Sequence, residues 1–502
     1  MVTDPAELAI RNTYYWDRKA MQMYPRDYSK AQVYHWLETI AQMSTRYLQF
    51  IGRPLENRIW FEYPAQTSPR FVNPGTVGRP TKIGRVVEDG TTSLTLIEYS
   101  PAYLPERVVD PCGRETVLVY DQADPPQLRR VEQKTAAGSD TTLLLEYDAG
   151  FPRHASHMTD GGGGVMTISY NSFAQPTRIV DALGQETELG YDPAGFLRTI
   201  TRFLGGIPAV TEIAHETIGG RLSNRIESVT GPDGQVASFE YDELDRVTTT
   251  TYPNGSVERA EYDRLDLASY TDQMGNVTVL VHDSERRLRK ITRPLEGDTT
   301  VDWCACGCPE QFKDARNQKT YLRYDLQGRL ISRASNDHWA EEFEYERTTG
   351  RVAFHRDARG LVTAFRYYAD DRLRSIRYLT SPAGDTIPPG SVDLRYDPAH
   401  PRLAEMTDES GTTTYEYGPM TPASAGAAGR VSRLSRTSPS GQGTVIDYHY
   451  DPGGRPTGRT VTDLAGATVS QFTAEYDELG RVARKSNSLG QFTIEYLDMG
   501  CG

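Results

Sequence analysis

The sequence predicts an all-β fold in which tandem β-hairpins of about 21 residues form one continuous curled sheet, a spiral or open barrel-like shell. Three observations predict it. The dipeptide Tyr-Asp occurs nine times among the 502 residues. Tyr, with 30 copies, outnumbers Phe, with 14, although Phe suits a conventional dry core better. The 44 Gly and 30 Pro supply the turn residues that many short strands need.

The Tyr-Asp pairs recur at a common period. They are Tyr120-Asp121, Tyr147-Asp148, Tyr191-Asp192, Tyr241-Asp242, Tyr262-Asp263, Tyr324-Asp325, Tyr396-Asp397, Tyr450-Asp451 and Tyr476-Asp477. Degenerate copies, such as Tyr345-Glu346, fill the gaps between them. The shortest steps cluster near about 21 residues, and we interpret the longer ones as loop insertions.

Each copy has the chemistry of a strand ending in a tight turn. The clearest copies read Tyr324-Asp325-x-x-Gly328-Arg329 and Tyr476-Asp477-x-x-Gly480-Arg481. Asp accepts backbone N–H bonds at the start of a turn, and Gly adopts the positive φ that the turn requires. Flanking residues alternate, as in Phe239-Glu240-Tyr241, which is the period of a strand. We therefore interpret these residues as structural, because general acid–base catalysis needs two carboxyls that converge on one cleft.

Composition and charge exclude several classes of partner. The formal net charge is −13, which argues against a nucleic-acid partner and against docking on anionic lipid. No apolar stretch approaches the roughly 18–20 residues of a membrane-spanning helix, so we expect no membrane insertion. The first residues lack the basic and apolar regions of a secretory signal, which leaves the localisation open.

The repeated Tyr-Asp-x-x-Gly-Arg pattern resembles the YD-repeat, or RHS-repeat, family, whose related arrays occur in Tc toxin complexes and teneurins. The resemblance covers about residues 80–500, and residues 53–63 are similar to a segment that precedes the repeats in such proteins. It implies a β-sheet that spirals into a hollow shell around a variable toxin polypeptide, in a secreted or cell-surface setting. We expect an N-terminal region over 1–80 that caps the sheet edge, and a repeat array over 81–502 that is truncated at its C-terminus.

The width of the sheet sets its expected shape. Seventeen hairpins give about 34 strands, which at about 4.8 Å each make a sheet about 160 Å wide. Twist makes a sheet of this width curl. Closed once, it forms a ring about 50 Å across but only about 20 Å tall, a band rather than a capsule. We therefore expect the array to join further repeat segments or other subunits.

Three of the five cysteines crowd into one short stretch. Cys304, Cys306 and Cys308 alternate along Trp303-Cys-Ala-Cys-Gly-Cys, which on a strand places them on one face. They are weak candidates for a metal or redox site, because Cys112 and Cys501 are remote and no second Cys pair completes a zinc pattern. The favoured interpretation is a degenerate repeat in which Trp303 replaces Tyr.

The segment before the repeats has two possible structures. Ser29 and Gln32 fit a capping box, and a following apolar periodicity predicts a helix over about 30–50. A strand pair around Trp36 is the alternative that the family resemblance implies. Either one is placed to cover the first open strand edge.

The leading functional hypothesis is a non-enzymatic scaffold that encloses or delivers a polypeptide cargo and needs no cofactor. A surface module that binds carbohydrate through exposed Tyr is the alternative. A self-cleaving enzyme is the third hypothesis, because Asp451-Pro-Gly-Gly superficially fits the cleavage motif of the family. Since Asp451 directly follows Tyr450 in an ordinary repeat, we interpret that motif as a turn.

Overall fold

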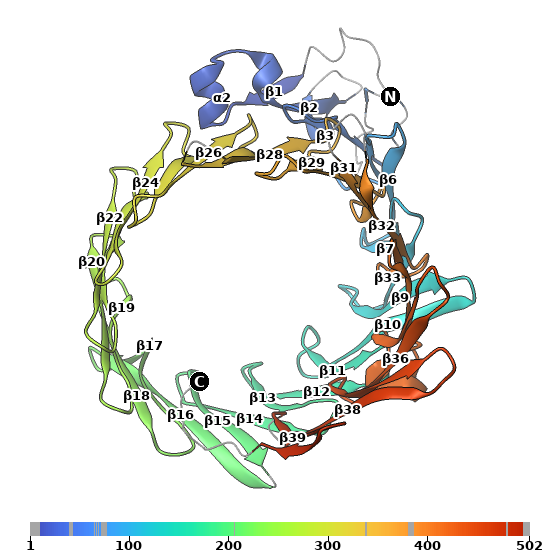
Figure 1. The fold of residues 1–502 in the computed structure, drawn as a ribbon. Coiled ribbons are helices and arrows are strands. Elements are labelled where there is room, and N and C mark those ends of the chain that lie inside the picture. The colour runs from blue at the N-terminus through green and yellow to red at the C-terminus, as the bar shows by residue number, and fades with distance from the viewer. Residues whose placement is uncertain are drawn as a thin grey trace. The chain divides into compact units, whose positions relative to one another are not determined.

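The fold consists of one element, the antiparallel β-hairpin, repeated along the chain (Figure 1). The computed structural model describes residues 11–39, 44–64, 66, 68, 70–71, 78–204, 206–336, 339–379, 386–477 and 480–494. Within them, 40 strands belong to one sheet, and antiparallel registers join consecutive strands within each unit, such as β18 (Val236–Tyr241) with β19 (Val247–Thr251) and β26 (Lys319–Tyr324) with β27 (Leu330–Ser335). The predicted all-β array of hairpins is confirmed.

The chain divides into two compact units, which are described separately. Unit 1 contains Met1–Asp140, Val301–Thr414 and Thr437–Ser440, and unit 2 contains Thr141–Thr300, Tyr415–Arg436 and Gly441–Gly502. Each unit is therefore built from stretches that lie far apart in the sequence.

The first stretch of unit 1 contains β1 (Asn12–Tyr15), α2 (Arg18–Met23), the 3₁₀ turn η1 (Tyr28–Lys30), β2 (Gln32–Glu38), β3 (Ser44–Gly52), β4 (Ile59–Glu62), β5 (Lys82–Val86), β6 (Thr92–Tyr99), β7 (Pro105–Val109), β8 (Glu115–Tyr120) and β9 (Leu128–Thr135). The second contains β25 (Pro309–Lys313), β26 (Lys319–Tyr324), β27 (Leu330–Ser335), β28 (Trp339–Tyr345), β29 (Val352–Arg356), β30 (Val362–Tyr367), β31 (Leu373–Leu379), β32 (Thr386–Tyr396), β33 (Leu403–Asp408) and β34 (Gly411–Tyr417), whose last residues belong to unit 2.

The first stretch of unit 2 contains most of β10 (Gly138–Tyr147), then β11 (Ala155–Asp160), β12 (Val165–Tyr170), β13 (Pro176–Val180), β14 (Glu186–Tyr191), β15 (Leu197–Leu204), β16 (Ile207–Ile218), β17 (Arg221–Thr230), β18 (Val236–Tyr241), β19 (Val247–Thr251), β20 (Val257–Asp263), β21 (Asp266–Thr271), β22 (Val277–His282), β23 (Leu288–Arg293) and the start of β24 (Gly297–Trp303). Its later part contains η2 (Pro422–Ala427), most of β35 (Val431–Thr437), β36 (Gly443–Tyr450), β37 (Pro456–Asp463), β38 (Thr468–Tyr476), β39 (Val482–Asn487) and β40 (Gly490–Thr493).

A β-bulge recurs where the repeat tyrosine ends its strand. In the hairpin of β18 and β19, Glu240 pairs with Thr249 but Tyr241 pairs with Val247, so the partner strand carries one extra residue. The same shift occurs before Tyr324 and before Tyr476. Bulges bend a strand and increase its twist, so each repeat adds curvature to the sheet.

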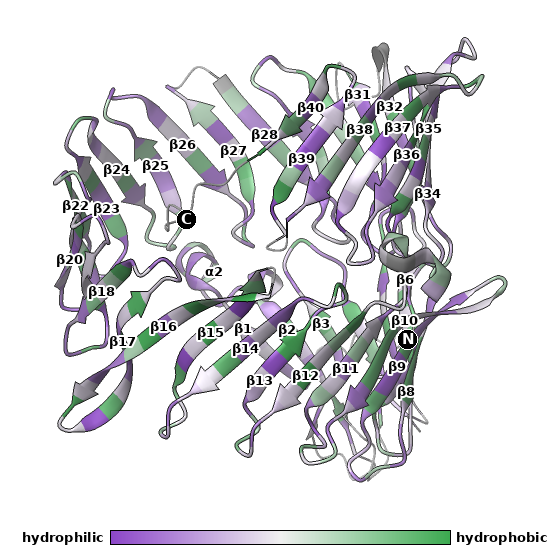
Figure 2. Cartoon of the chain, turned by 90° about the horizontal axis from the view of Figure 1, so that it is seen from below, coloured by the Kyte–Doolittle hydropathy of each residue, from purple (hydrophilic) through white to green (hydrophobic). Residues whose placement is uncertain are grey.

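The sheet has no thick apolar core. Hydrophilic and hydrophobic residues are interleaved along the strands (Figure 2). Leu37 and Phe50 in the first stretch of unit 1 and Val362 in the second are among the few large side chains that are fully buried. A single sheet with both faces partly solvated explains why half-buried Tyr is preferred over Phe.

The N-terminal region is built mainly of strands. The helix predicted over about 30–50 is wrong, since β2 and β3 pair there, with Val33 opposite Gly52. The alternative strand pair around Trp36 is correct. The capping-box prediction is also wrong: Asp27 caps η1 by accepting from Ser29 N at 3.0 Å, and the short helix α2 precedes it. The strand pairing of aromatic and β-branched residues outweighs a weak local helix periodicity.

No helix among the described residues is both long and apolar enough to cross a membrane. Cys501 lies outside the described residues.

Candidate functional site

The turn at each repeat, here called a corner, is held by its aspartate. Asp242 Oδ1 accepts from Leu244 N at 2.8 Å and from Arg246 N at 3.1 Å, while Arg246 Nε donates to Asp242 Oδ2 at 2.7 Å. The Arg246 side chain and these turn amides hold the pKa of Asp242 below its usual value. The carboxylate therefore closes the turn in its charged form.

The arginine of one corner also reaches the tyrosine of the next. The Arg246 guanidinium lies 3.9 Å from the centroid of the Tyr262 ring, and Arg329 lies 4.4 Å from that of Tyr345. Arg455 is placed in the same way over Tyr476, at 4.6 Å. At these three corners a cation–π contact therefore ties the turn to the next corner.

The hydroxyl of the repeat tyrosine makes a further contact, a hydrogen bond that the sequence pattern does not predict. Tyr345 Oη donates to Leu330 O at 2.7 Å, and Tyr191 Oη donates to Pro176 O at 2.9 Å, in each case 15 residues back. The acceptor lies at the start of the preceding strand on the same edge. The same spacing of 15 residues recurs at Tyr170, Tyr241 and Tyr367 and is the signal that could have revealed this bond. It lengthens to 19 residues at Tyr450 and 20 at Tyr476.

Most of the predicted corner residues follow this scheme. Carboxylates that accept turn amides include Asp121, Asp148, Asp192, Asp325, Asp397, Asp451 and Asp477. Arg329 and Arg481 donate to the aspartates of their own corners. The corner after Tyr262 is different, because pairing continues to Asp263 opposite Asp266 and leaves a two-residue turn. Asp451 closes a turn onto Arg455, as expected.

Positive φ at the fourth turn residue yields a first prediction. Gly328 has φ 73° and no atom near the position that a Cβ would take, whereas Ala174 adopts φ 61° at the equivalent position of another corner. We expect Gly328→Ala to cost about 1 kcal/mol and Ala174→Gly to gain roughly 0.5 kcal/mol, because left-handed backbone strains any Cβ. Urea unfolding measures the change in the free energy of unfolding for each variant. Changes of the same sign would contradict the assignment of both residues to the same left-handed turn position.

The Tyr345 hydroxyl yields a second prediction. We expect Tyr345→Phe to lower the free energy of unfolding by about 1 kcal/mol, because Leu330 O loses its donor. Tyr345→Ala also removes the ring under Arg329 and should cost about 3–5 kcal/mol. Tyr103→Phe, at a residue that is 50% exposed, is the control and should be neutral in the same urea titration.

Within unit 1, the corners of β26–β33 contact the turns of the first stretch, and we call this contact the seam. Glu56 lies between Arg85 and Arg329, with N–O distances of 3.5 Å to each. Asn57 N donates to Thr348 O at 3.0 Å. Charged corner residues are therefore shared between two parts of the chain more than 250 residues apart.

The most buried ion pair of the seam joins Arg114 to Asp370, whose side chains are each 7% exposed. Arg372 also reaches Asp370, at 2.7 Å. Further along, His400 Nε2 lies 2.8 Å from Asp140 Oδ2. Breaking a buried pair of this kind from one side is costly, because the remaining buried charge loses its nearest partner.

Strand β2 carries a buried histidine, His35. His35 is fully buried and stacks on Phe50, with ring centroids 4.6 Å apart. Its Nδ1 lies 2.7 Å from Asn12 Oδ1, and its Nε2 lies 3.2 Å from Arg11 Nη2. Since arginine only donates, Nε2 is the acceptor and the ring is neutral. Burial, with Arg11 and Arg58 nearby, lowers the pKa of His35 to about 4.

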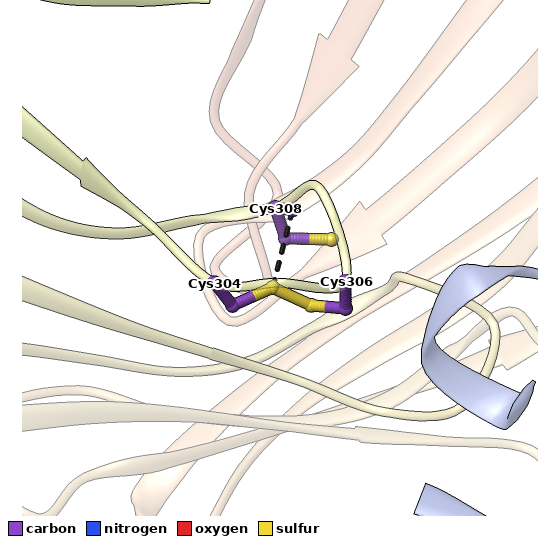
Figure 3. Close-up of side chains that lie close together, drawn as sticks. All are labelled: Cys304, Cys306 and Cys308. Carbon is purple, nitrogen blue, oxygen red and sulfur yellow. Dashed lines mark hydrogen bonds between the residues drawn. A yellow bond between two sulfur atoms is a disulfide. The ribbon is translucent and has the colours of Figure 1, made fainter. Parts of the chain in front are cut away.

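The three clustered cysteines occupy a turn between β24 and β25 (Figure 3). They form the corner of a degenerate repeat in which Trp303 takes the place of Tyr, as favoured from the sequence, and not a strand that presents all three on one face. Cys304 N donates to Cys308 O at 2.9 Å and Gly307 N donates to Cys304 O at 3.0 Å, the pattern of an ordinary corner. Cys304 stands where other corners have Asp, and its Sγ accepts from Cys308 N at 3.3 Å. Cys304 and Cys306 form a disulfide, and Cys308 is a free thiol.

Comparisons with known proteins agree with this geometry. Residues 223–257, which contain the Tyr241 corner, match the RHS repeat family model. The resemblance to the RHS-repeat family is confirmed. No curated protein matches the sequence.

Two solved structures share the fold of this chain. The crystal structure of TcdB2-TccC3-Cdc42 superposes with a TM-score of 0.56 at 12% identity, over 93% of this chain and 25% of that one. The structure of the Photorhabdus luminescens Tc holotoxin pore, with a mutation in TccC3, superposes with a TM-score of 0.50 at 14% identity, over 94% and 28%. The chain therefore spans about a quarter of the length of these structures.

Proposed function

We propose that this chain is a non-enzymatic wall segment of an RHS-type shell that encloses a polypeptide cargo. The observation that carries the proposal is the seam, where corners of β26–β33 bind a stretch more than 250 residues away through buried charges. A wall that must exclude solvent and proteases needs contacts of this kind between its turns as well as along its strands.

The corner chemistry supports a structural role for the repeat residues. Carboxylates close turns, arginines lie over the next tyrosine, and tyrosine hydroxyls bind backbone carbonyls. These groups are occupied by the fold, and the same occupation counts against stacking of sugars on the corner tyrosines. The proposed alternative of a carbohydrate-binding module thus has less support, and catalysis by the Asp451 turn has none beyond its sequence.

The comparisons suggest the kind of partner. Both matched structures name TccC3, which one of them pairs with TcdB2, and their chains are about four times longer than the matched portion. We infer that this segment joins further repeat segments or subunits, and that the cargo is a polypeptide outside the present sequence. The predicted division into a region over 1–80 and an array over 81–502 remains part of this proposal.

A protease-protection experiment tests the proposed function. Trypsin cuts after arginine, so the rate of cutting after the seam residues Arg114 and Arg329 is compared with the rate after Arg359, whose side chain is 77% exposed. We expect cutting in the seam to be slower by at least about tenfold, because trypsin reaches buried backbone only through opening of the wall. The Asp370→Ala variant, which removes a seam ion pair, should speed cutting after Arg114. Equal rates at the seam and at Arg359 would contradict a closed wall.

A further inference from the structure

The cysteine turn departs from every other corner in its side chains while keeping the corner backbone. Its residues Trp303-Cys304-Ala-Cys306-Gly307-Cys308 align with Tyr324-Asp325-Leu-Gln-Gly328-Arg329. Gly307 has φ 90°, as Gly328 has φ 73°. Cys therefore replaces the Asp that closes the turn and the Arg that reaches the next tyrosine. Other corners fold with Asp and Arg at these two positions, so folding of the turn does not explain why three thiols are present.

The turn brings the three sulfur atoms together. The Sγ atoms of Cys304, Cys306 and Cys308 all lie within 4.8 Å of one another. Two of these atoms are joined in the Cys304–Cys306 disulfide. Thiolates around one zinc ion, at about 2.3 Å from the metal, are about 3.8 Å apart, so reduction has to separate this pair by only about 2 Å before all three can share an ion. The Cys308 N–H that points at Cys304 Sγ is the kind of donor that stabilises a metal-bound thiolate.

Cationic side chains of α2 lie beside the turn. A Cβ built on Gly307 would be 3.9 Å from Arg18 Nη1, and Ala305 lines a shallow pocket with Arg18 and Met21. Lys19 Nζ donates to Tyr324 O at 2.6 Å, which holds the helix against the adjoining repeat. Three thiolates and one divalent ion carry a net charge of −1, which a neighbouring guanidinium offsets.

We propose that the cysteine turn, with its disulfide reduced, is a binding site for one zinc-like, thiophilic divalent metal ion. Two molecules of a small thiol reduce the Cys304–Cys306 disulfide to two thiols and are themselves oxidised to the disulfide of the small thiol. The metal ion then displaces three thiol protons and forms three metal–sulfur bonds. Among the described residues this group supplies three ligand atoms, so water takes the fourth tetrahedral position. The disulfide is the oxidised, metal-free state of the same site.

The test uses Co²⁺ as a spectroscopic probe and Zn²⁺ as its competitor, on the full chain under a phosphine reductant. We expect one equivalent of Co²⁺ to give thiolate-to-cobalt charge-transfer absorption, and Zn²⁺ to abolish it. Oxidation of the chain should also abolish it. Absence of the absorption in the reduced chain would overturn the proposal.

Matched variants separate metal binding from the fold. Cys304→Asp restores the usual corner acceptor, so we expect an unchanged or higher Tm without metal and an affinity for Co²⁺ at least about tenfold weaker. Cys308→Arg, which restores the usual corner arginine, should behave alike. Cys112→Ser changes an exposed free cysteine elsewhere and should bind Co²⁺ as the parent chain does. Unchanged affinity in the first two variants would also overturn the proposal.

Discussion

Replacing Asp370 by alanine is expected to lower the free energy of unfolding of unit 1 by about 3–5 kcal/mol. The carboxylate sits between Arg114 and Arg372, and its side chain is 7% exposed. Its removal leaves Arg372 without this partner and leaves Arg114 paired with Asp110 alone, in a region with little water. Chemical denaturation, followed by a probe in the first stretch of unit 1, measures the loss.

Lys82→Ala is the matched control for this prediction. Lys82 and Glu62 form an ion pair at 2.6 Å in the same unit, but both side chains are about half exposed. Breaking an exposed pair should cost less than about 1 kcal/mol. A similar cost for Asp370→Ala and Lys82→Ala would show that the seam contributes no more than surface charge.

The stability of unit 1 is expected to fall by about 3 kcal/mol between pH 6.5 and pH 4 because of His35. The folded ring has its pKa lowered to about 4, whereas the unfolded ring titrates near its ordinary value of 6.5. Between pH 6.5 and pH 4 the unfolded chain therefore binds a proton at His35 that the folded chain does not bind. The stability that neutral His35 contributes is fully present above pH 6.5, is lost progressively as the pH falls, and is gone once the pH has passed through 4.

The surroundings of His35 explain the direction of this effect. A proton on Nε2 would face Arg11, with Arg58 also nearby, and Glu38 offsets them only in part. Denaturation midpoints measured from pH 7.5 to pH 4 test the prediction. His35→Gln cannot titrate, so its pH slope over this interval should be flatter than that of the parent chain whatever its stability at pH 7. Equal slopes would contradict the assignment.

Local chemistry explains why so much of the fold could be predicted from sequence. Asp, Gly and the strand alternation act within one turn, so Asp242 and Gly328 could be assigned to corners directly. The cysteine turn follows the same local chemistry. Trp303 in the Tyr position indicated a degenerate repeat, and Gly307 with its positive φ and the Cys304–Cys308 backbone bond make its corner. The pattern did not indicate the Cys304–Cys306 disulfide.

Contacts between distant parts of the chain could not be predicted. Nothing near Glu56 in the sequence indicates Arg329, and nothing near Arg114 indicates Asp370, because these pairs depend on where separate repeats meet. The contact from Arg246 to the Tyr262 ring was also missed, although it follows the repeat period. The N-terminal helix failed because pairing of β2 with β3 outweighs local periodicity.

Small-angle X-ray scattering of the purified chain tests most directly whether these repeats curl into a wall around open space. The proposed curl predicts a distribution of interatomic distances whose maximum lies well beyond half the longest distance, as in a ring or shell. A distribution with its maximum at or below half the longest distance, as in a filled globule or a rod, would contradict the central claim.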